Sequence, residues 1–160
     1  EFKSALKNPK DILEALTQLL QENTNLKKEV EKATQEKALG FTADLVNQAE
    51  SINGIQFIAQ KVDLPNAEAV KTLAYSLKDK LPNLYVVLAA EIDGKPSLTV
   101  MLSENLVKEK NLNAGNIIRE LAKEIDGGGG GQPFYATAGG KNSAGIEKAL
   151  LQAKNYIPKL

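Results

Sequence analysis

The sequence predicts an α/β (α+β) fold in which a long N-terminal helix of coiled-coil character precedes a compact domain built on a mixed sheet. Apolar residues recur every four and three positions between Ile12 and Lys37, which is the pattern of a helix with one apolar seam. Strand-like and helix-like segments alternate after residue 50 and include a β-hairpin. We therefore divide the chain into residues 1–50, a helical linker or oligomerisation segment, and residues 51–160, a globular domain.

The first helix is predicted to begin at Asn8, a favourable N-cap residue, with Pro9 in the first helical position. A polar seam position such as Asn23 often fixes the register or the number of helices in a coiled coil. Because no later helix has a matching length, we expect the seam to pair with another copy or with a segment upstream, and docking on the globular part is the alternative. The candidate oligomerisation residues are Ile12, Leu16, Leu19, Asn23, Leu26 and Val30.

The junction between the two parts is predicted to be helical as well. Gly40 and Phe41 weaken the helical pattern, which we expect to resume and to end at a C-cap formed by Asn53 and Gly54. A strand over residues 55–62 follows.

The centre of the globular domain is predicted to contain a helix and a hairpin. Asn66 caps a helix over residues 67–81. The apolar run 84–92 is typical of a buried central strand, and a tight Asp-Gly turn leads from it into a returning strand over residues 96–102. Helices capped by Ser103 and Asn113 are expected to end near Lys108 and Ile125, and a last helix is expected over residues 144–156.

The glycine-rich tract from Asp126 to Ser143 is the candidate site. Glycines let a ligand approach the backbone closely, and successive N–H groups can form an anion-binding nest. Lys141 and a helix N-terminus at Asn142 add positive charge, Arg119 and Lys123 share one helical face, and the two aromatic residues after the tract can stack on exposed bases. The candidate nucleic-acid-binding residues are Arg119, Lys123, Gly127, Gly128, Gly129, Gly130, Gly131, Gln132, Phe134, Tyr135, Gly139, Gly140, Lys141 and Asn142.

Other interpretations of the tract have weaker support from the sequence. The phosphate-binding loop motif fails because Asn142 follows Lys141, and the dinucleotide fingerprint fails because its closing glycine is missing. Two alternatives stay open: a flexible glycine linker, and a structural tract whose lysines are ordinary surface and whose aromatics are core.

Composition excludes several classes of chemistry. The chain has 20 basic and 20 acidic residues, so any basic surface must be local. The absence of cysteine and histidine removes thiolate chemistry, disulfides and the commonest general base, so we assign no catalytic residue and no metal ligand. No apolar run is long enough to span a bilayer and no signal pattern is visible, so we expect a soluble cytoplasmic protein without a membrane partner.

The run Gly127–Asn142, preceded by Ile118–Ala122, resembles the glycine-rich C-terminal domain of alanyl-tRNA synthetases. A similar domain follows the catalytic core of DHH phosphoesterases, including the RecJ-like nucleases. In those phosphoesterases a histidine typically closes the glycine run, whereas Gln132 stands here and the Asp-His-His core is absent. The resemblance covers roughly residues 50–160 and favours the synthetase branch.

The resemblance implies a tRNA-binding appendage that clamps the outer corner of tRNA and helps aminoacylation and editing act on one bound molecule. Its implied partners are tRNA-Ala, the rest of the parent synthetase and, through the N-terminal helix, a further copy of the chain. ATP and zinc are expected in the parent enzyme, with no cofactor in this fragment. A substrate-binding domain of a DHH-type phosphoesterase and a purely structural oligomerisation module are the alternatives.

Overall fold

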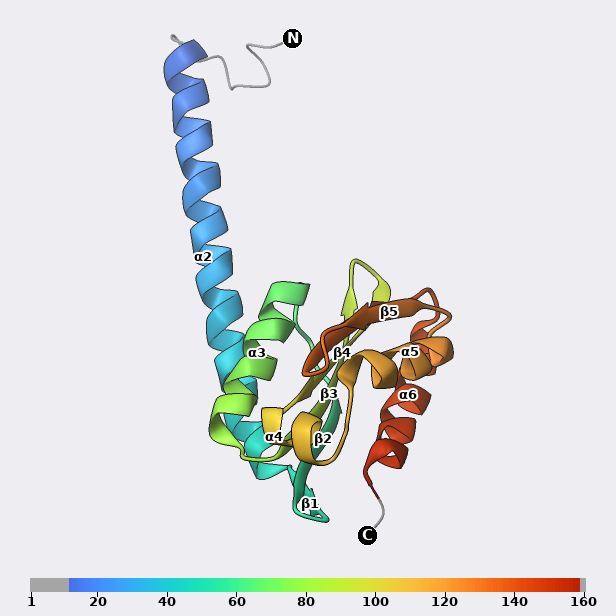
Figure 1. The fold of residues 1–160 in the computed structure, drawn as a ribbon. Coiled ribbons are helices and arrows are strands. Elements are labelled where there is room, and N and C mark those ends of the chain that lie inside the picture. The colour runs from blue at the N-terminus through green and yellow to red at the C-terminus, as the bar shows by residue number, and fades with distance from the viewer. Residues whose placement is uncertain (1–11, 159–160) are drawn as a thin grey trace. The chain divides into compact units, whose positions relative to one another are not determined.

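The computed structural model describes residues 12–158 (Figure 1). Contacts within the chain divide it into two compact units, with the division between Gln35 and Glu36. The helix start predicted at Asn8 and Pro9 lies outside the described residues. Among the residues that are described, no helix is both long and apolar enough to cross a membrane.

The long predicted helix is present as α2, Ile12–Asn47. It continues through Gly40, where a single glycine costs about 1 kcal/mol relative to alanine. That cost is offset in the second unit because Ala38 and Leu45, on either side of the glycine, are buried in its core. In the first unit the seam side chains are exposed, from 38% for Ile12 to 62% for Val30.

The predicted helix end at Asn53 and Gly54 is wrong. Both residues have positive φ, 52° and 77°, but they form the turn of a hairpin between β1, Glu50–Ile52, and β2, Ile55–Lys61. Asn-Gly suits a two-residue hairpin turn for the same reason that it suits a helix C-cap, since both residues tolerate the left-handed conformation.

The globular unit is built on a six-stranded mixed sheet with the order β1-β2-β3-β4-β6-β5. Only the β2–β3 pair is parallel among the pairs of this sheet, because helix α3 connects those two strands. The expected mixed-sheet α/β domain is therefore confirmed. The remaining elements of this sheet are α3 Ala67–Lys80, β3 Leu84–Ile92, β4 Lys95–Leu102, β5 Gly128–Gly131 and β6 Tyr135–Gly139.

Each face of the sheet is covered by helices, and β3 contributes to both cores (Figure 1). Val86 and Leu88 pack on the side of α3 and the end of α2. Tyr85 and Val87 point to the other side, where α5, Ala114–Glu124, and α6, Ile146–Ala153, lie. A central strand buried on both faces has no polar alternation, which explains the continuous apolar run in the sequence.

The helix caps were predicted well, with one difference at Ser103. The side chain of Asn66 accepts a hydrogen bond from the Ala69 N–H at 2.8 Å, and Asn113 caps α5 in the same way. Ser103 precedes α4, Glu104–Glu109, but its hydroxyl accepts from the backbone N–H of Leu84 at 2.8 Å, which ties this turn to β3. The last predicted helix is α6 with a 3-10 turn at each end, Ser143–Gly145 and Lys154–Tyr156.

Candidate nucleic-acid interface

The glycine tract forms β5, the last strand of the sheet, and pairs antiparallel with β6 from Gly128 opposite Gly139 to Gly131 opposite Ala136. It is therefore part of the folded sheet and not a flexible linker. Neither strand was predicted, because glycine has a low strand propensity and the tract carries no apolar alternation.

Alternate glycines of the tract have different surroundings. A methyl group at Gly129 would lie 2.5 Å from Ala138 Cβ and closer still to the Thr137 carbonyl oxygen, and Gly131 is equally crowded by the backbone of β6. A methyl group at Gly128 would have no atom within 4 Å. Close strand pairing thus requires glycine at some positions, whereas at Gly128 glycine only keeps the backbone uncovered.

A hollow of about 690 Å³ lies where β5 begins, between the β3–β4 hairpin and the glycine strands. Its lining includes glycine backbone from both strands together with Ile92 and Pro96. Lys95, Asp126 and Lys141 also line it. An apolar lining beside two lysines is suited to a ligand that has a flat apolar part and negative charge.

The two lysines of this hollow are available for a ligand. Lys95 and Lys141 are exposed, and neither makes an ion pair with any residue that the structure describes. The nearby carboxylate of Glu91 is bound to Lys61 at 2.6 Å. Asp126 is thus the acidic residue of the hollow's lining, which leaves two positive charges against one negative.

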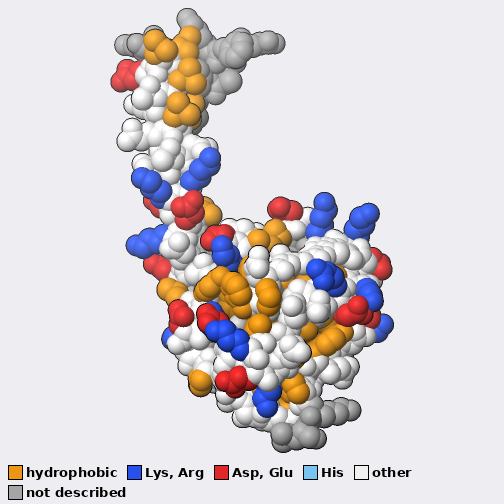
Figure 2. Space-filling view, in the orientation of Figure 1, with side chains coloured by type: hydrophobic (Ala, Val, Ile, Leu, Met, Phe, Trp, Pro, Cys, Tyr) orange, Lys and Arg blue, Asp and Glu red, His pale blue; other side chains and the backbone are white. Residues whose placement is uncertain are grey.

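The predicted aromatic residues lie on the α3 side of the sheet. The ring of Tyr135 lies 5.9 Å from the ring of Tyr75, and Lys78 Nζ lies 5.5 Å from the ring centre of Phe134. Burial raises the pKa of Tyr135, with smaller contributions from Tyr75 and the charge of Glu68. Figure 2 shows hydrophobic side chains gathered over α3 and the neighbouring strands on this face of the globular unit.

The predicted basic residues of α5 lie on the opposite side of the sheet. Arg119 donates a hydrogen bond to Asn116 at 3.1 Å, and its guanidinium is near Gly130. Lys123 pairs with Glu120 at 2.6 Å, and this partner holds the pKa of Lys123 above its usual value. The structure therefore does not bring the aromatic and basic candidates into one cluster, and Lys123 already has a counter-charge.

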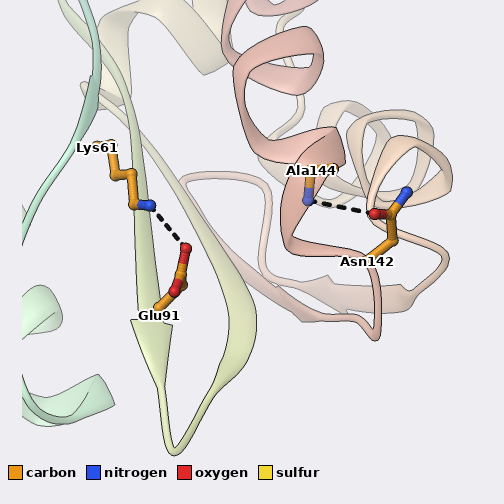
Figure 3. A network of polar contacts seen from close by, with 4 residues as sticks. All are labelled: Lys61, Glu91, Asn142 and Ala144. Carbon is orange, nitrogen blue, oxygen red and sulfur yellow. Dashed lines mark hydrogen bonds and ion pairs between the residues drawn. The ribbon is translucent and has the colours of Figure 1, made fainter.

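The predicted anion site at Asn142 is largely occupied by contacts within the chain. The Asn142 side chain accepts a hydrogen bond from the Ala144 N–H at 3.2 Å (Figure 3), so this helix end is capped by its own residue. The backbone N–H groups of Lys141 and Asn142 both donate to the Ile125 carbonyl, at 2.9 and 3.0 Å. What remains for a ligand is the ammonium group of Lys141.

The other candidates shape the strands around the hollow. Gln132 is exposed, and its N–H donates to the Tyr135 carbonyl at 2.8 Å across the β5–β6 turn. The Gly140 N–H donates to the Pro96 carbonyl at 3.0 Å, and a methyl group at Gly140 would lie 2.8 Å from Ile125 Cγ1. These contacts fix the backbone that borders the hollow.

Sequence reasoning did not identify Lys95, Tyr75 and Lys78 as site residues. The turn at residues 93–94 was a signal for Lys95, because the residue that follows a hairpin turn lies at an end of the sheet, where its side chain can reach a ligand. Tyr75 and Lys78 carried no such signal. Their place beside β6 depends on how α3 packs on the sheet, which no local pattern encodes.

Comparison with known proteins shows the family of this chain. The model of the DHHA1 domain matches residues 54–159. The alanine–tRNA ligase of Christiangramia forsetii is 46% identical over 157 residues, which cover 98% of this chain and 18% of the ligase. That of Cytophaga hutchinsonii is also 46% identical, over 95% of this chain and 17% of the ligase. The chain thus spans less than a fifth of the length of these curated relatives.

A solved structure shares the fold. The C-Ala domain of Aquifex aeolicus alanyl-tRNA synthetase superposes with a TM-score of 0.62 at 24% sequence identity, covering 68% of this chain and 96% of that domain. At this level of identity the match concerns the fold and not the individual contact residues.

Proposed function

Because the chain belongs to the DHHA1 domain family, we propose that it is the tRNA-binding C-terminal part of an alanine–tRNA ligase. In this proposal it carries no catalytic residue and holds tRNA-Ala while the aminoacylation and editing parts of the parent enzyme act on the same molecule. ATP, zinc and the ligase reaction belong to that parent enzyme, in the cytoplasm. The relatives' names and the glycine-rich hollow support the proposal.

The observation that carries the proposal is the pair of lysines beside uncovered glycine backbone. Lys95 and Lys141 line the same hollow, and neither has an ion-pair partner among residues 12–158. Lysines that contact phosphates release bound counterions, which makes affinity fall as salt rises. The missing side chain of Gly128 lets a ribose or phosphate approach the strand itself.

The test is binding of the chain to tRNA-Ala at several salt concentrations, with a non-cognate tRNA and a single-stranded oligonucleotide for comparison. We expect salt-dependent binding that favours folded tRNA. The double variant Lys95→Ala/Lys141→Ala should reduce the slope of log affinity against log salt by about 1.4 to 1.8, since each phosphate contact contributes roughly 0.7 to 0.9.

A matched control removes the same charge elsewhere. Lys80 and Lys110 are exposed and form no ion pair with the described residues. Lys80 ends α3 and Lys110 follows α4, both near the opposite end of β3 and β4 from the hollow. Lys80→Ala/Lys110→Ala should leave the salt slope within error of the unmodified chain. Equal slopes for both double variants would remove the hollow from the proposal. Metal-dependent hydrolysis of nucleotides by the chain would instead favour the phosphoesterase alternative.

The exposed seam favours a second function, oligomerisation. Leu16, Leu26 and Val30 are 45%, 60% and 62% exposed, which is unusual for a periodic apolar stripe. We propose that residues 1–50 act as the linker and assembly segment and that residues 51–160 bind tRNA. A truncation for light scattering should begin at Glu36, because Ala38 and Leu45 belong to the globular core. An equally oligomeric truncation would show that the seam is not the assembly surface.

A further inference from the structure

Three aromatic side chains and one lysine form an accessible surface on the α3 side of the sheet. We call Tyr75, Lys78, Phe134 and Tyr135 the aromatic platform. The tyrosine rings lie 5.9 Å apart with an angle of 37° between their planes, and Lys78 Nζ lies 5.5 Å from the Phe134 ring centre. Figure 2 shows the hydrophobic patch in this part of the globular unit.

The platform differs from a core cluster in its exposure. Tyr75 is 37% exposed, and Phe134 and Tyr135 are half-buried. Within the described chain, the hydroxyls of Tyr75 and Tyr135 make no hydrogen bond. Tyr85, by contrast, is fully buried and donates its hydroxyl hydrogen to the Ala153 carbonyl at 2.8 Å. A buried tyrosine normally finds such a partner, whereas the hydroxyls of Tyr75 and Tyr135 are left for solvent or a ligand.

The chemistry of the platform suits a flat aromatic ligand. Bases stack on aromatic side chains, and this contact tolerates any base because every base has a π face. Lys71 lies four residues before Tyr75 and is exposed on the same helical face, so it can reach an adjoining phosphate. Glu68 and Glu104 are also near, and the Glu104 carboxylate lies 3.8 Å from Lys78. The local charge is therefore balanced, and stacking must provide most of the affinity.

The platform is also joined to the hollow by one strand. β6 begins at Tyr135 and ends at Gly139, which lines the hollow. Those four steps span roughly 13 Å. Stacked nucleotides advance by about 3.4 Å per step, so four steps, between the first and the fifth of five consecutive nucleotides, cover about the same distance.

We propose that Tyr75 and Lys78 join Phe134 and Tyr135 in a stacking site for an unpaired nucleobase of the RNA bound at the hollow. This inference rests on the proposed function. It assigns to α3 a binding role that is separate from the phosphate contacts of Lys95 and Lys141. It also separates the two surfaces experimentally, because stacking does not release counterions whereas phosphate contacts do.

The test compares Tyr75→Leu with Tyr75→Phe in tRNA binding measured by fluorescence anisotropy over a range of salt. Leucine keeps an apolar side chain without a ring, and phenylalanine keeps the ring. We expect Tyr75→Leu to weaken binding roughly five- to a hundredfold at every salt concentration with an unchanged salt slope. Tyr75→Phe should bind within about twofold of the unmodified chain. Leu151→Ala, at a 78% exposed position on α6, is the surface control and should have no effect.

Tyrosine emission gives a second measurement that does not depend on a variant. The chain has four tyrosines and no tryptophan, so stacking on the platform should quench its intrinsic emission when RNA is added. Unchanged affinity of Tyr75→Leu, or no quenching on saturation with RNA, would overturn the platform while leaving the proposed function intact. If the unmodified chain is folded by circular dichroism but binds no RNA, both proposals fail.

Discussion

The substitution Gly129→Ala, compared with Gly128→Ala, tests why β5 consists of glycine. Both positions lie in β5, and each has a glycine before and after it in the sequence. A methyl group at Gly129 would lie 2.5 and 2.6 Å from Ala138 Cβ and Cα, and nearer still to the Thr137 carbonyl oxygen. These are largely backbone atoms, which cannot rotate away, so β5 must separate from β6.

The magnitude follows from the two opposite effects. Overpacking costs typically 1 to 3 kcal/mol, and we expect Gly129→Ala to lower the free energy of unfolding by about that amount. Gly128→Ala meets no atom within 4 Å and has no positive φ, so it should raise stability by about 0.4 to 1 kcal/mol through the smaller entropy of the unfolded chain. The variants should therefore differ by roughly 1.4 to 4 kcal/mol, or about 3 to 16 °C in Tm.

The assay is thermal and urea unfolding followed by far-ultraviolet circular dichroism, with tRNA binding measured on the same samples. Because Gly128 lines the hollow, its alanine variant should bind tRNA more weakly although it is more stable. Equal Tm values for the two variants would refute close strand packing as the reason for glycine at position 129. Unchanged tRNA affinity of Gly128→Ala would refute an approach of RNA to the backbone there.

Three further predictions concern the stability of the globular unit. Tyr85→Phe leaves the Ala153 carbonyl without its donor and should cost about 1 to 2 kcal/mol in urea unfolding. Asn66→Ala removes the cap of α3 and should cost about 1 kcal/mol, whereas Asn66→Asp should retain most of the stability. Lys148 holds the pKa of Glu124 below its usual value. The unmodified chain should therefore be more stable than Glu124→Gln by a full margin above the unfolded carboxyl pKa of 4.5, and this margin should disappear as pH falls through the lower folded pKa. A margin that persists in acid would contradict this.

Elements with a strong local pattern were predicted closely from the sequence. The run 84–92 and the turn after it gave the central hairpin, because an apolar run and an Asp-Gly pair restrict the chain without tertiary help. The Asn53-Gly54 pair did not decide between a helix end and a hairpin, since positive φ satisfies both. β5 had no local pattern at all, because its pairing depends on the backbone of β6.

The sequence indicated only those parts of the candidate site that have a local pattern. The tract itself was found from its glycines, and Lys141 from its position beside them. Phe134 and Tyr135 were expected in one site with Arg119, but they lie against α3, whereas Arg119 belongs to α5 on the other side of the sheet. Lys95 and Tyr75 come from elements that reach the tract only in the folded chain.

The two proposed contact surfaces have a fixed separation, which bears on the kind of RNA that they favour. β6 lies between β4 and β5 in the sheet, and its Ala136 and Ala138 are buried, so its two ends cannot move relative to each other without disrupting the core. A flexible single strand must lose conformational freedom to reach the platform and the hollow together. A folded RNA that already holds a base and a phosphate at this spacing does not, so we expect the two proposed surfaces to favour structured tRNA over unstructured RNA of the same charge.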